Sequence, residues 1–154
     1  MSAVRIGVIS DTHGLLRTEA TAILRNCQTI IHAGDIDQPQ VLQALEQIAP
    51  TTAVRGNMDV GSWANKLKIT ERLQIGNWSL VVVHNINDFN PTKDRADVVI
   101  FGHSHRFLNE ERNGVLFLNP GSAGPRRFSL PITMAVLTLG EQVTVEKVTL
   151  KSKA

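Results

Sequence analysis

The chain has 154 residues, the length of one ordinary domain, which is enough to bury a hydrophobic core without disulfide staples. Hydrophobic residues make up 42% of the chain and charged residues 19%, which excludes the composition of a disordered protein. The formal net charge of +2 permits an anionic substrate, and without a clustered basic face it argues against strong nucleic-acid binding.

Two further features of the chain limit its class. Cys27 is the only cysteine, so no intramolecular disulfide can form and a buried small hydrophobe is expected there. The apolar run at residues 4–10 is too short for a signal peptide or a membrane span. With no internal repeat or linker, we expect a single domain over residues 1–154, no membrane partner and a cytoplasmic location.

The first third of the chain alternates short apolar runs with amphipathic stretches. Strands are predicted at residues 4–10, 29–33 and 52–55, and helices at residues 17–26 and 38–48. Strands separated by helices indicate βαβ units, and therefore a parallel sheet with right-handed crossovers.

The second half of the chain has a different pattern. Predicted strands at residues 66–75 and 78–84 flank Gly76-Asn77, and those at 106–110 and 115–118 flank a turn ending in Asn113-Gly114. A buried run covers residues 98–101, and strands at 131–139 and 143–150 flank Gly140-Glu141. Two sheets packed face to face, with helices outside, would accommodate both halves.

Five of the predicted strands end in side chains that can bind a metal ion. In open α/β sheets ligands bind at the carboxyl ends of the strands, so these side chains are expected to meet at one edge. Buried polar groups need partners, and a pair of cations would satisfy them together. The side chains are, in chain order, Asp11, His13, Asp35, Asn57, His84, His103 and His105.

The chemistry of these seven side chains favours two metal ions over one. Histidine nitrogens with carboxylate and amide oxygens suit manganese, iron, zinc and similar ions, and the lack of cysteine argues against a structural zinc site. Seven ligands exceed what one tetrahedral ion uses, but they suit two ions that share a carboxylate. Pairs of ions about 3.5–4 Å apart commonly hydrolyse phosphate esters, because they activate a bridging water and neutralise the phosphoryl oxygens.

The order of these fragments resembles the calcineurin-like metallophosphoesterase family: Asp11-x-His13, Gly34-Asp35, Gly56-Asn57-x-Asp59, His84 and Gly102-His103-Ser104-His105. The match spans about residues 4–122 and includes the Asn-Pro-Gly-Ser turn at 119–122. The chain is most similar to the small prokaryotic branch, the YfcE-type phosphodiesterases, which is related to the retromer subunit Vps29. Each fragment alone is weak, but together, in order and at strand ends, they are highly specific.

The resemblance implies a four-layer α/β/β/α sandwich of the metallophosphoesterase type. It also implies which residues hold which ion: Asp11, His13 and His105 the first, Asn57, His84 and His103 the second, with Asp35 bridging both. Two divalent ions are implied, with manganese as the first choice and iron, zinc, nickel or magnesium as alternatives. The implied activity is hydrolysis of a small phosphate ester, in the first place a phosphodiester, through a hydroxide that bridges the ions.

Met58 stands where larger family members have a histidine that stabilises the transition state or protonates the leaving group. A methionine cannot transfer a proton, and acid–base catalysis typically contributes about 10²–10⁴-fold to the rate. The YfcE-type branch also commonly lacks this histidine. We therefore expect activity on esters whose leaving group needs little help from an acid.

Residues 85–97 depart from the family pattern as well. Asn85 stands where relatives usually have glycine, and the connection barely reaches the dozen residues that a parallel crossover needs. It contains Pro91 and several asparagines. We predict a loop or a single helical turn here instead of a full helix, and hence a more open site.

Several polar residues near the predicted site allow more than one interpretation. His32 is interpreted as a satisfied core histidine, because strand alternation turns it away from the edge. Asp59 is either a partner that orients a ligand or a loop cap. Arg55, Arg126 and Arg127 either steer a phosphate or lie in solvated loops, and the solvated loop is favoured.

Several functions compete for this sequence. Besides the phosphodiesterase, the chain could be a phosphomonoesterase, a nuclease, or a non-catalytic interaction scaffold like Vps29, whose relatives keep the fold but have lost catalytic ligands. The weak net charge argues against a nuclease. The scaffold relatives are altered at the position of His13, whereas all seven positions are filled here, which favours the enzyme. Assembly into a homo-oligomer is compatible with the sequence.

Overall fold

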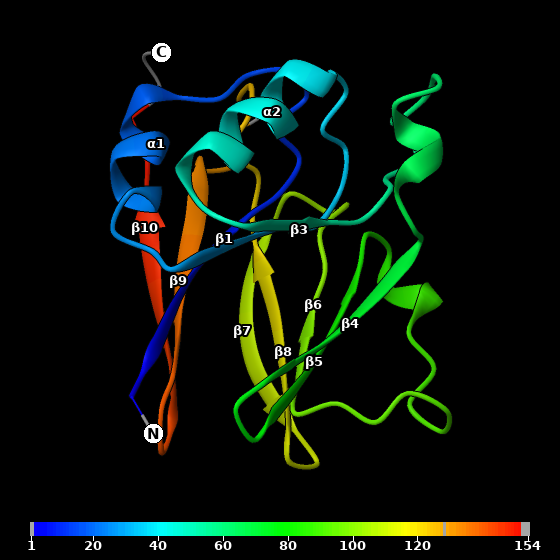
Figure 1. Cartoon of the computed structure of the whole chain (residues 1–154), viewed down its shortest axis with the longest axis vertical. Coiled ribbons are helices and arrows are strands. Elements are labelled where there is room, and N and C mark those ends of the chain that lie inside the picture. The colour runs from blue at the N-terminus through cyan, green and yellow to red at the C-terminus, as the bar shows by residue number, and fades with distance from the viewer. Residues whose placement is uncertain (1, 128, 152–154) are drawn as a thin grey trace.

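The first β-sheet is built from both ends of the chain. In the computed structural model, which describes residues 2–127 and 129–151, its strand order is β10-β9-β1-β2-β3 (Figure 1). The central strands run parallel, and β9 and β10 add to the β1 edge in antiparallel fashion. The strands are β1 (Val4–Ile9), β2 (Thr29–His32), β3 (Thr51–Ala53), β9 (Thr133–Leu139) and β10 (Val143–Thr149).

The second sheet comes from the middle of the chain and has the order β4-β5-β6-β8-β7. Its three inner strands are parallel, and the two edge strands pair with them through antiparallel hairpins. Asn113 and Gly114 both have positive φ, as the tight Asn-Gly turn predicts. The strands are β4 (Thr70–Ile75), β5 (Trp78–Val83), β6 (Val98–Ile100), β7 (Phe107–Arg112) and β8 (Val115–Pro120).

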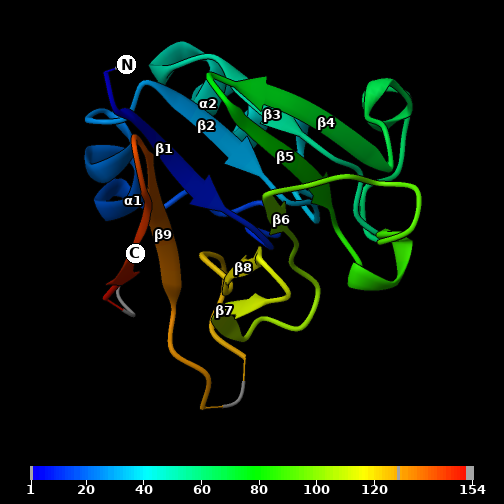
Figure 2. The ribbon, with the colours of Figure 1, turned by 90° about the horizontal axis from the view of Figure 1, so that it is seen from below.

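The two sheets pack face to face and enclose the main core (Figure 2). This core includes Ile6 and Ile31 of the first sheet and Ile100 and Leu118 of the second, all fully buried. Helices α1 (Thr18–Leu24) and α2 (Pro39–Ile48) connect β1, β2 and β3, as the βαβ pattern predicts, and form a second core against the outer face of the first sheet.

The outer face of the second sheet has only a thin cover. Ile86 and Phe89 pack there against Val81 and Val83, within a loop whose one regular element is the 3₁₀ turn η2 (Ile86–Asp88). The predicted single helical turn in residues 85–97 is therefore confirmed. The predicted sandwich of two sheets with helices outside is also confirmed, with this loop as its reduced fourth layer.

The sheets meet at the edge where β1, β2, β5 and β6 end. Asp11 donates its backbone N–H to Gly34 O (3.0 Å), and Gly102 donates to His84 O (3.0 Å), so neighbouring strand ends are tied together. His103 N donates to Asp11 Oδ2 (3.2 Å) and thereby joins the two sheets. None of the helices in residues 2–127 and 129–151 is long and apolar enough to cross a bilayer.

Candidate metal centre

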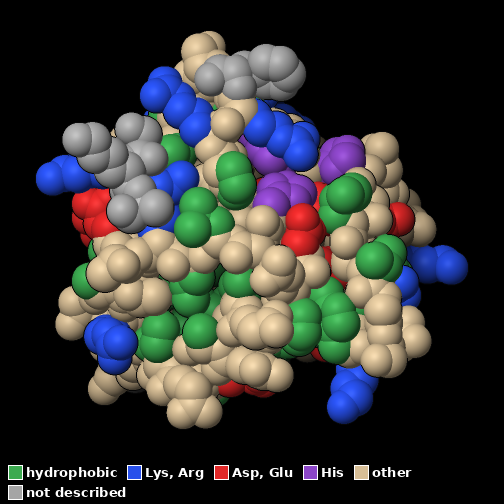
Figure 3. All heavy atoms as spheres, turned by 90° about the horizontal axis from the view of Figure 1, so that it is seen from above, with side chains coloured by type: hydrophobic (Ala, Val, Ile, Leu, Met, Phe, Trp, Pro, Cys, Tyr) green, Lys and Arg blue, Asp and Glu red, His purple; other side chains and the backbone are tan. Residues whose placement is uncertain are grey.

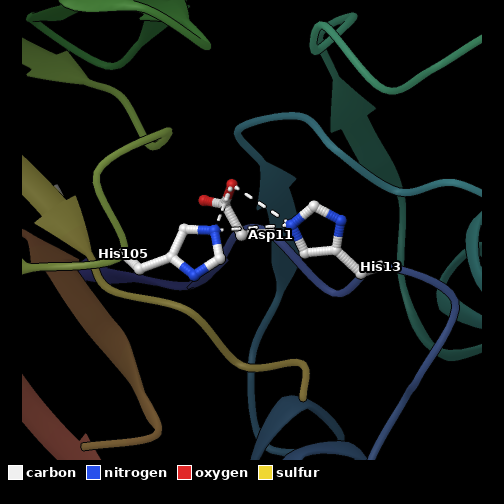
Figure 4. A group of neighbouring side chains, drawn as sticks. All are labelled: Asp11, His13 and His105. Atoms are coloured by element: carbon white, nitrogen blue, oxygen red, sulfur yellow. Dashed lines mark hydrogen bonds and ion pairs between the residues drawn. The ribbon is translucent and has the colours of Figure 1, made fainter. Parts of the chain in front are cut away.

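Asp11, His13 and His105 come together at this edge although they lie up to 94 residues apart (Figure 4). Asp11 Oδ1 lies 3.4 Å from His105 Nε2 and 3.9 Å from His13 Nε2. The two histidine Nε2 atoms are 3.4 Å apart. Asp11 and His105 are buried, so one carboxylate and two imidazoles face a common point with little solvent between them.

A second group adjoins the first and consists of Asp11, Asp35 and His84. Asp35 Oδ2 lies 3.2 Å from His84 Nε2 and 3.9 Å from His13 Nε2. Because Asp35 faces histidines of both groups, it lies where a shared ligand of two cations would lie.

Most residues of this edge have an unusual backbone. Among the described non-glycine residues, seven have positive φ, and six of them belong to the centre or contact it: Asp11, His13, Asp35, Asp37, His103 and His105. Aspartate and histidine tolerate this conformation better than most residues, yet each such position carries strain. Strain of this kind gathers at functional sites, where the surroundings hold it in place.

The glycines before two of the candidate ligands allow close approach. A Cβ at Gly34, which has φ +102°, would lie 2.7 Å from His84 Nδ1. A Cβ at Gly56 would lie 2.2 Å from Asp35 Oδ1. These contacts explain why glycine precedes Asp35 and Asn57 in the sequence.

Asp59 supports the loops that carry the candidate ligands. Its buried carboxylate accepts hydrogen bonds from the backbone N–H groups of Asp35 (3.0 Å), Ile36 (2.8 Å), Asp37 (2.8 Å) and Gly56 (2.8 Å). Of the two interpretations open from the sequence, the geometry therefore favours the partner that orients ligands.

Sequence reasoning did not identify Asp37. Its Oδ2 lies 3.0 Å from His13 Nδ1, and because an ionised carboxylate only accepts, His13 donates this hydrogen bond. The proton is thereby held on Nδ1, and the lone pair of Nε2 is left facing Asp11. The signal available in the sequence was a second acidic residue two positions after Asp35.

The buried side-chain atoms that lack a hydrogen-bond partner all lie here, as far as the described residues show: Asp11 Oδ1, Asp37 Oδ1, His84 Nε2 and His105 Nδ1. His84 Nδ1 donates to Ala33 O (2.8 Å), which leaves Nε2 facing Asp35 without the alignment of a hydrogen bond. An unsatisfied buried polar group costs about 1–3 kcal/mol. Divalent cations between Asp11, Asp35 and His84 would satisfy the atoms that point inward.

The pKa values of His84 and Asp35 are shifted in opposite directions, in part by the interaction between their two side chains. Burial by itself lowers the pKa of His84, but the nearby carboxylates of Asp35 and Asp11 outweigh it, and the pKa is raised. Burial raises the pKa of Asp35, and the proximity of His84 together with the hydrogen bond from Met58 N (2.9 Å) outweighs it, so that this pKa is lowered. The centre thus favours positive charge beside ionised carboxylates.

Asn57 and His103 lie at the solvent-exposed side of the centre. Both line a cleft of about 390 Å³ together with His84, and the rings of His84 and His103 lie edge to face with centroids 5.2 Å apart. Arg55 also lines this cleft, while its Nε donates to Asp59 O (3.0 Å). Figure 3 shows histidine side chains gathered on this face of the molecule.

His32 is a core residue with both ring nitrogens satisfied, as predicted. Its Nδ1 accepts from Gly34 N (3.0 Å), so Nε2 carries the proton and donates to Thr12 Oγ1 (3.0 Å). Burial is the main cause that lowers its pKa to about 4. His32 therefore stays neutral beneath the centre.

Comparison of the sequence with known proteins identifies the family to which the chain belongs. The profile of the calcineurin-like phosphoesterase superfamily domain matches residues 4–142. A probable metallophosphoesterase of Methanothermobacter thermautotrophicus is 31% identical over 92% of this chain and 90% of its own length. A phosphodiesterase of Methanocaldococcus jannaschii is 30% identical over 77% of this chain and 83% of its own.

Solved structures show the same fold. An archaeal phosphodiesterase superposes with a TM-score of 0.83 at 26% identity, covering 95% of this chain and 99% of that one. Vps29 of Chaetomium thermophilum superposes with a TM-score of 0.75 at 22% identity, covering 95% and 97%. At that identity, the second likeness concerns the fold alone.

Proposed function

Because the chain belongs to the calcineurin-like phosphoesterase superfamily, we propose that it hydrolyses phosphodiesters with two divalent metal ions bound at this centre. The observation that carries the proposal is the convergence of two carboxylates and three imidazoles around unpartnered buried atoms. The relatives described as phosphodiesterases support a diester as the substrate.

The geometry supports a division of the ligands between two ions. Asp35 faces both His13 and His84, which suits a bridging ligand. Asp11 Oδ1 also lies 3.9 Å from His84 Nε2, so Asp11 borders the second position as well. We assign the first ion to Asp11, His13 and His105, the second to Asn57, His84 and His103, and Asp35 to both.

Two such ions, when bound, supply a water of lowered pKa and neutralise charge on the phosphoryl oxygens. Hydrogen bonds within the chain orient the side chains that would bind these ions. Asp37 and the carbonyl of Ala33 each accept from a histidine Nδ1, which aims the Nε2 lone pairs of His13 and His84 into the centre. The Met58 N–H fixes Asp35 Oδ1 and leaves Oδ2 facing the histidines.

The position next to Asn57 offers no acid for the leaving group. Met58 is half exposed and cannot donate a proton from its side chain, and the guanidinium of Arg55 in the cleft wall does not serve as a general acid. The leaving group therefore departs as an anion, which favours diesters of acidic alcohols or phenols.

The leaving-group proposal is tested with aryl methyl phosphates of graded phenol pKa. The rate is expected to fall steeply as the phenol pKa rises, and Met58→His is expected to flatten this dependence by supplying an acid. A dependence that is already flat in the wild type would show that a general acid exists and would contradict this part of the proposal.

The activity itself is tested by removing and restoring the metal. Protein stripped with a chelator is expected to hydrolyse a chromogenic phosphodiester only after Mn²⁺ is added, and Asp35→Ala is expected to abolish the reaction. Glu111→Ala, at an exposed carboxylate of β7, is the matched control and keeps full activity. Activity that survives Asp35→Ala, or no metal uptake, would overturn the proposal and favour the non-catalytic scaffold.

The same preparation distinguishes the finer alternatives. Metal analysis is expected to find two ions per chain, with His13→Ala and Asn57→Ala each losing one. Parallel assays with a monoester compare the phosphodiesterase with the phosphomonoesterase. Manganese as the native ion, a single domain, a cytoplasmic location and a homo-oligomer stay predictions.

A further inference from the structure

The large exposed hydrophobic side chains are concentrated beside the metal centre. Within residues 2–127 and 129–151 they are Met58, Val60 and Ile69, which are 50%, 67% and 51% exposed. Val60 and Ile69 line the same cleft as Asn57, His84 and His103. Single exposed hydrophobic residues are ordinary, but a group next to a catalytic cleft indicates a binding surface.

This apolar wall, defined as Val60 and Ile69, rests on an anchored segment. Trp63 and Leu67 pack into the core beneath the first sheet, and η1 (Ala64–Lys66) lies between them. Arg55 N donates to Lys68 O (2.8 Å), which holds the residue before Ile69 against the end of β3. The two side chains are therefore held toward the cleft by a fixed backbone.

The cleft lining also contains polar side chains, among them Asn85 and the exposed carboxylate of Asp88. The Asp88 carboxylate disfavours an anionic group beside it, and Arg55, which also lines the cleft, has its Nε bound to Asp59 O. The carboxylate also disfavours a departing oxyanion, and an apolar wall gives such an anion no stabilisation. The ester arm that stays on the phosphate is thus the part of a diester that suits this cleft.

We infer that the cleft binds the retained ester arm of the substrate, and that this arm is uncharged and apolar, such as an aryl group resting on Val60 and Ile69. The inference rests on the proposed phosphodiesterase function. It names Val60 and Ile69 as residues that determine specificity, since they contact only the arm and none of the reacting atoms.

The test uses two diesters with the same leaving group, 4-nitrophenyl phenyl phosphate and 4-nitrophenyl methyl phosphate. Wild-type protein with Mn²⁺ is expected to show about tenfold higher kcat/KM for the phenyl ester, because the ring buries apolar surface on the wall. Val60→Ser combined with Ile69→Ser is expected to reduce this preference to about twofold, through a higher KM for the phenyl ester alone. A third diester whose retained arm carries a carboxylate is expected to react poorly and to improve with Asp88→Asn.

Lys66→Ser is the matched control, because it shortens an exposed side chain of the same segment that does not line this cleft. It is expected to leave the phenyl-to-methyl ratio unchanged. If no diester is hydrolysed, the proposed function fails. If both are hydrolysed and the ratio is near one, or survives the double substitution, the inference about the arm fails while the proposed function stands. A double variant that changes only the oligomeric state would assign the wall to a contact between copies and would likewise overturn the inference.

Discussion

The two sides of the metal centre are built differently. The buried half, defined as Asp11, His13, Asp35, His84 and His105, is largely shielded from solvent. Asp37 orients His13, and the carbonyl of Ala33 orients His84. The open half, defined as Asn57 and His103, is exposed and borders the cleft. Under the proposed function, the difference teaches that the buried half is organised to hold cations before the substrate arrives, whereas the open half would contact the substrate.

Asp59 supports both halves, so replacing it with alanine is expected to have the largest effect. The substitution leaves four backbone N–H groups without their acceptor, three of them buried, and an unsatisfied buried group costs about 1–3 kcal/mol. The free energy of unfolding of the metal-free protein is expected to fall by at least about 3 kcal/mol in urea denaturation. Asp88→Ala, at an exposed carboxylate, is the control and should change stability by less than about 0.5 kcal/mol. A loss near the control value would show that Asp59 is only a loop cap.

His32 makes the stability beneath the buried half depend on pH. Its pKa is about 4 in the folded protein and about 6.5 when unfolded, so between these values only the unfolded chain binds the proton. Above pH 6.5 the residue is neutral in both states and does not lower the free energy of unfolding. As the pH falls from 6.5 to 4, protonation of the unfolded chain lowers this free energy by about 3 kcal/mol at most.

The measurement compares urea denaturation of metal-free wild type and His32→Gln at several pH values between 7 and 4. Glutamine can still accept from Gly34 and donate to Thr12 but does not titrate, and the carboxylates contribute to both proteins alike. The wild type is expected to lose more stability than the variant on acidification. Parallel curves would show that His32 is not the titrating group.

These contacts also show where sequence reasoning reached its limit. The positions of Asp11, Asp35 and His84 follow from hydrophobic periodicity, because a buried strand ends where its polar residue begins and parallel strands end at a common edge. The pairing of Asp37 with His13 does not follow, because it depends on left-handed backbone at both residues, which periodicity does not encode. The four hydrogen bonds to Asp59 do not follow either, because they depend on how the loops after β2 and β3 fold against each other, which periodicity does not encode. The thin cover over β5 was predictable, since residues 85–97 are too few for a full crossover helix.

Asp37→Asn is expected to weaken the buried half alone. Asparagine keeps the shape but removes the negative charge that holds the proton on His13 Nδ1, so the first ion is expected to bind about tenfold or more weakly. Calorimetric titration of metal-free protein with Mn²⁺ measures both binding steps at once. The second step serves as the internal control and should keep its affinity. Equal weakening of both steps would contradict the separation of the two halves.

The smallest expected effect concerns backbone strain in the open half. His103 has φ +74°, and its backbone N–H stays bound to Asp11 Oδ2 whatever side chain it carries. Both His103→Ala and His103→Gly remove the imidazole, but only glycine adopts this backbone without strain, so the glycine variant is expected to be about 1 kcal/mol more stable than the alanine variant in metal-free form. Both are expected to bind the second ion weakly. Equal unfolding free energies of the two variants would mean that the backbone at this position is not strained. The expected difference would mean that the open half loses stability in order to direct a ligand toward the cleft, as sites under functional constraint do.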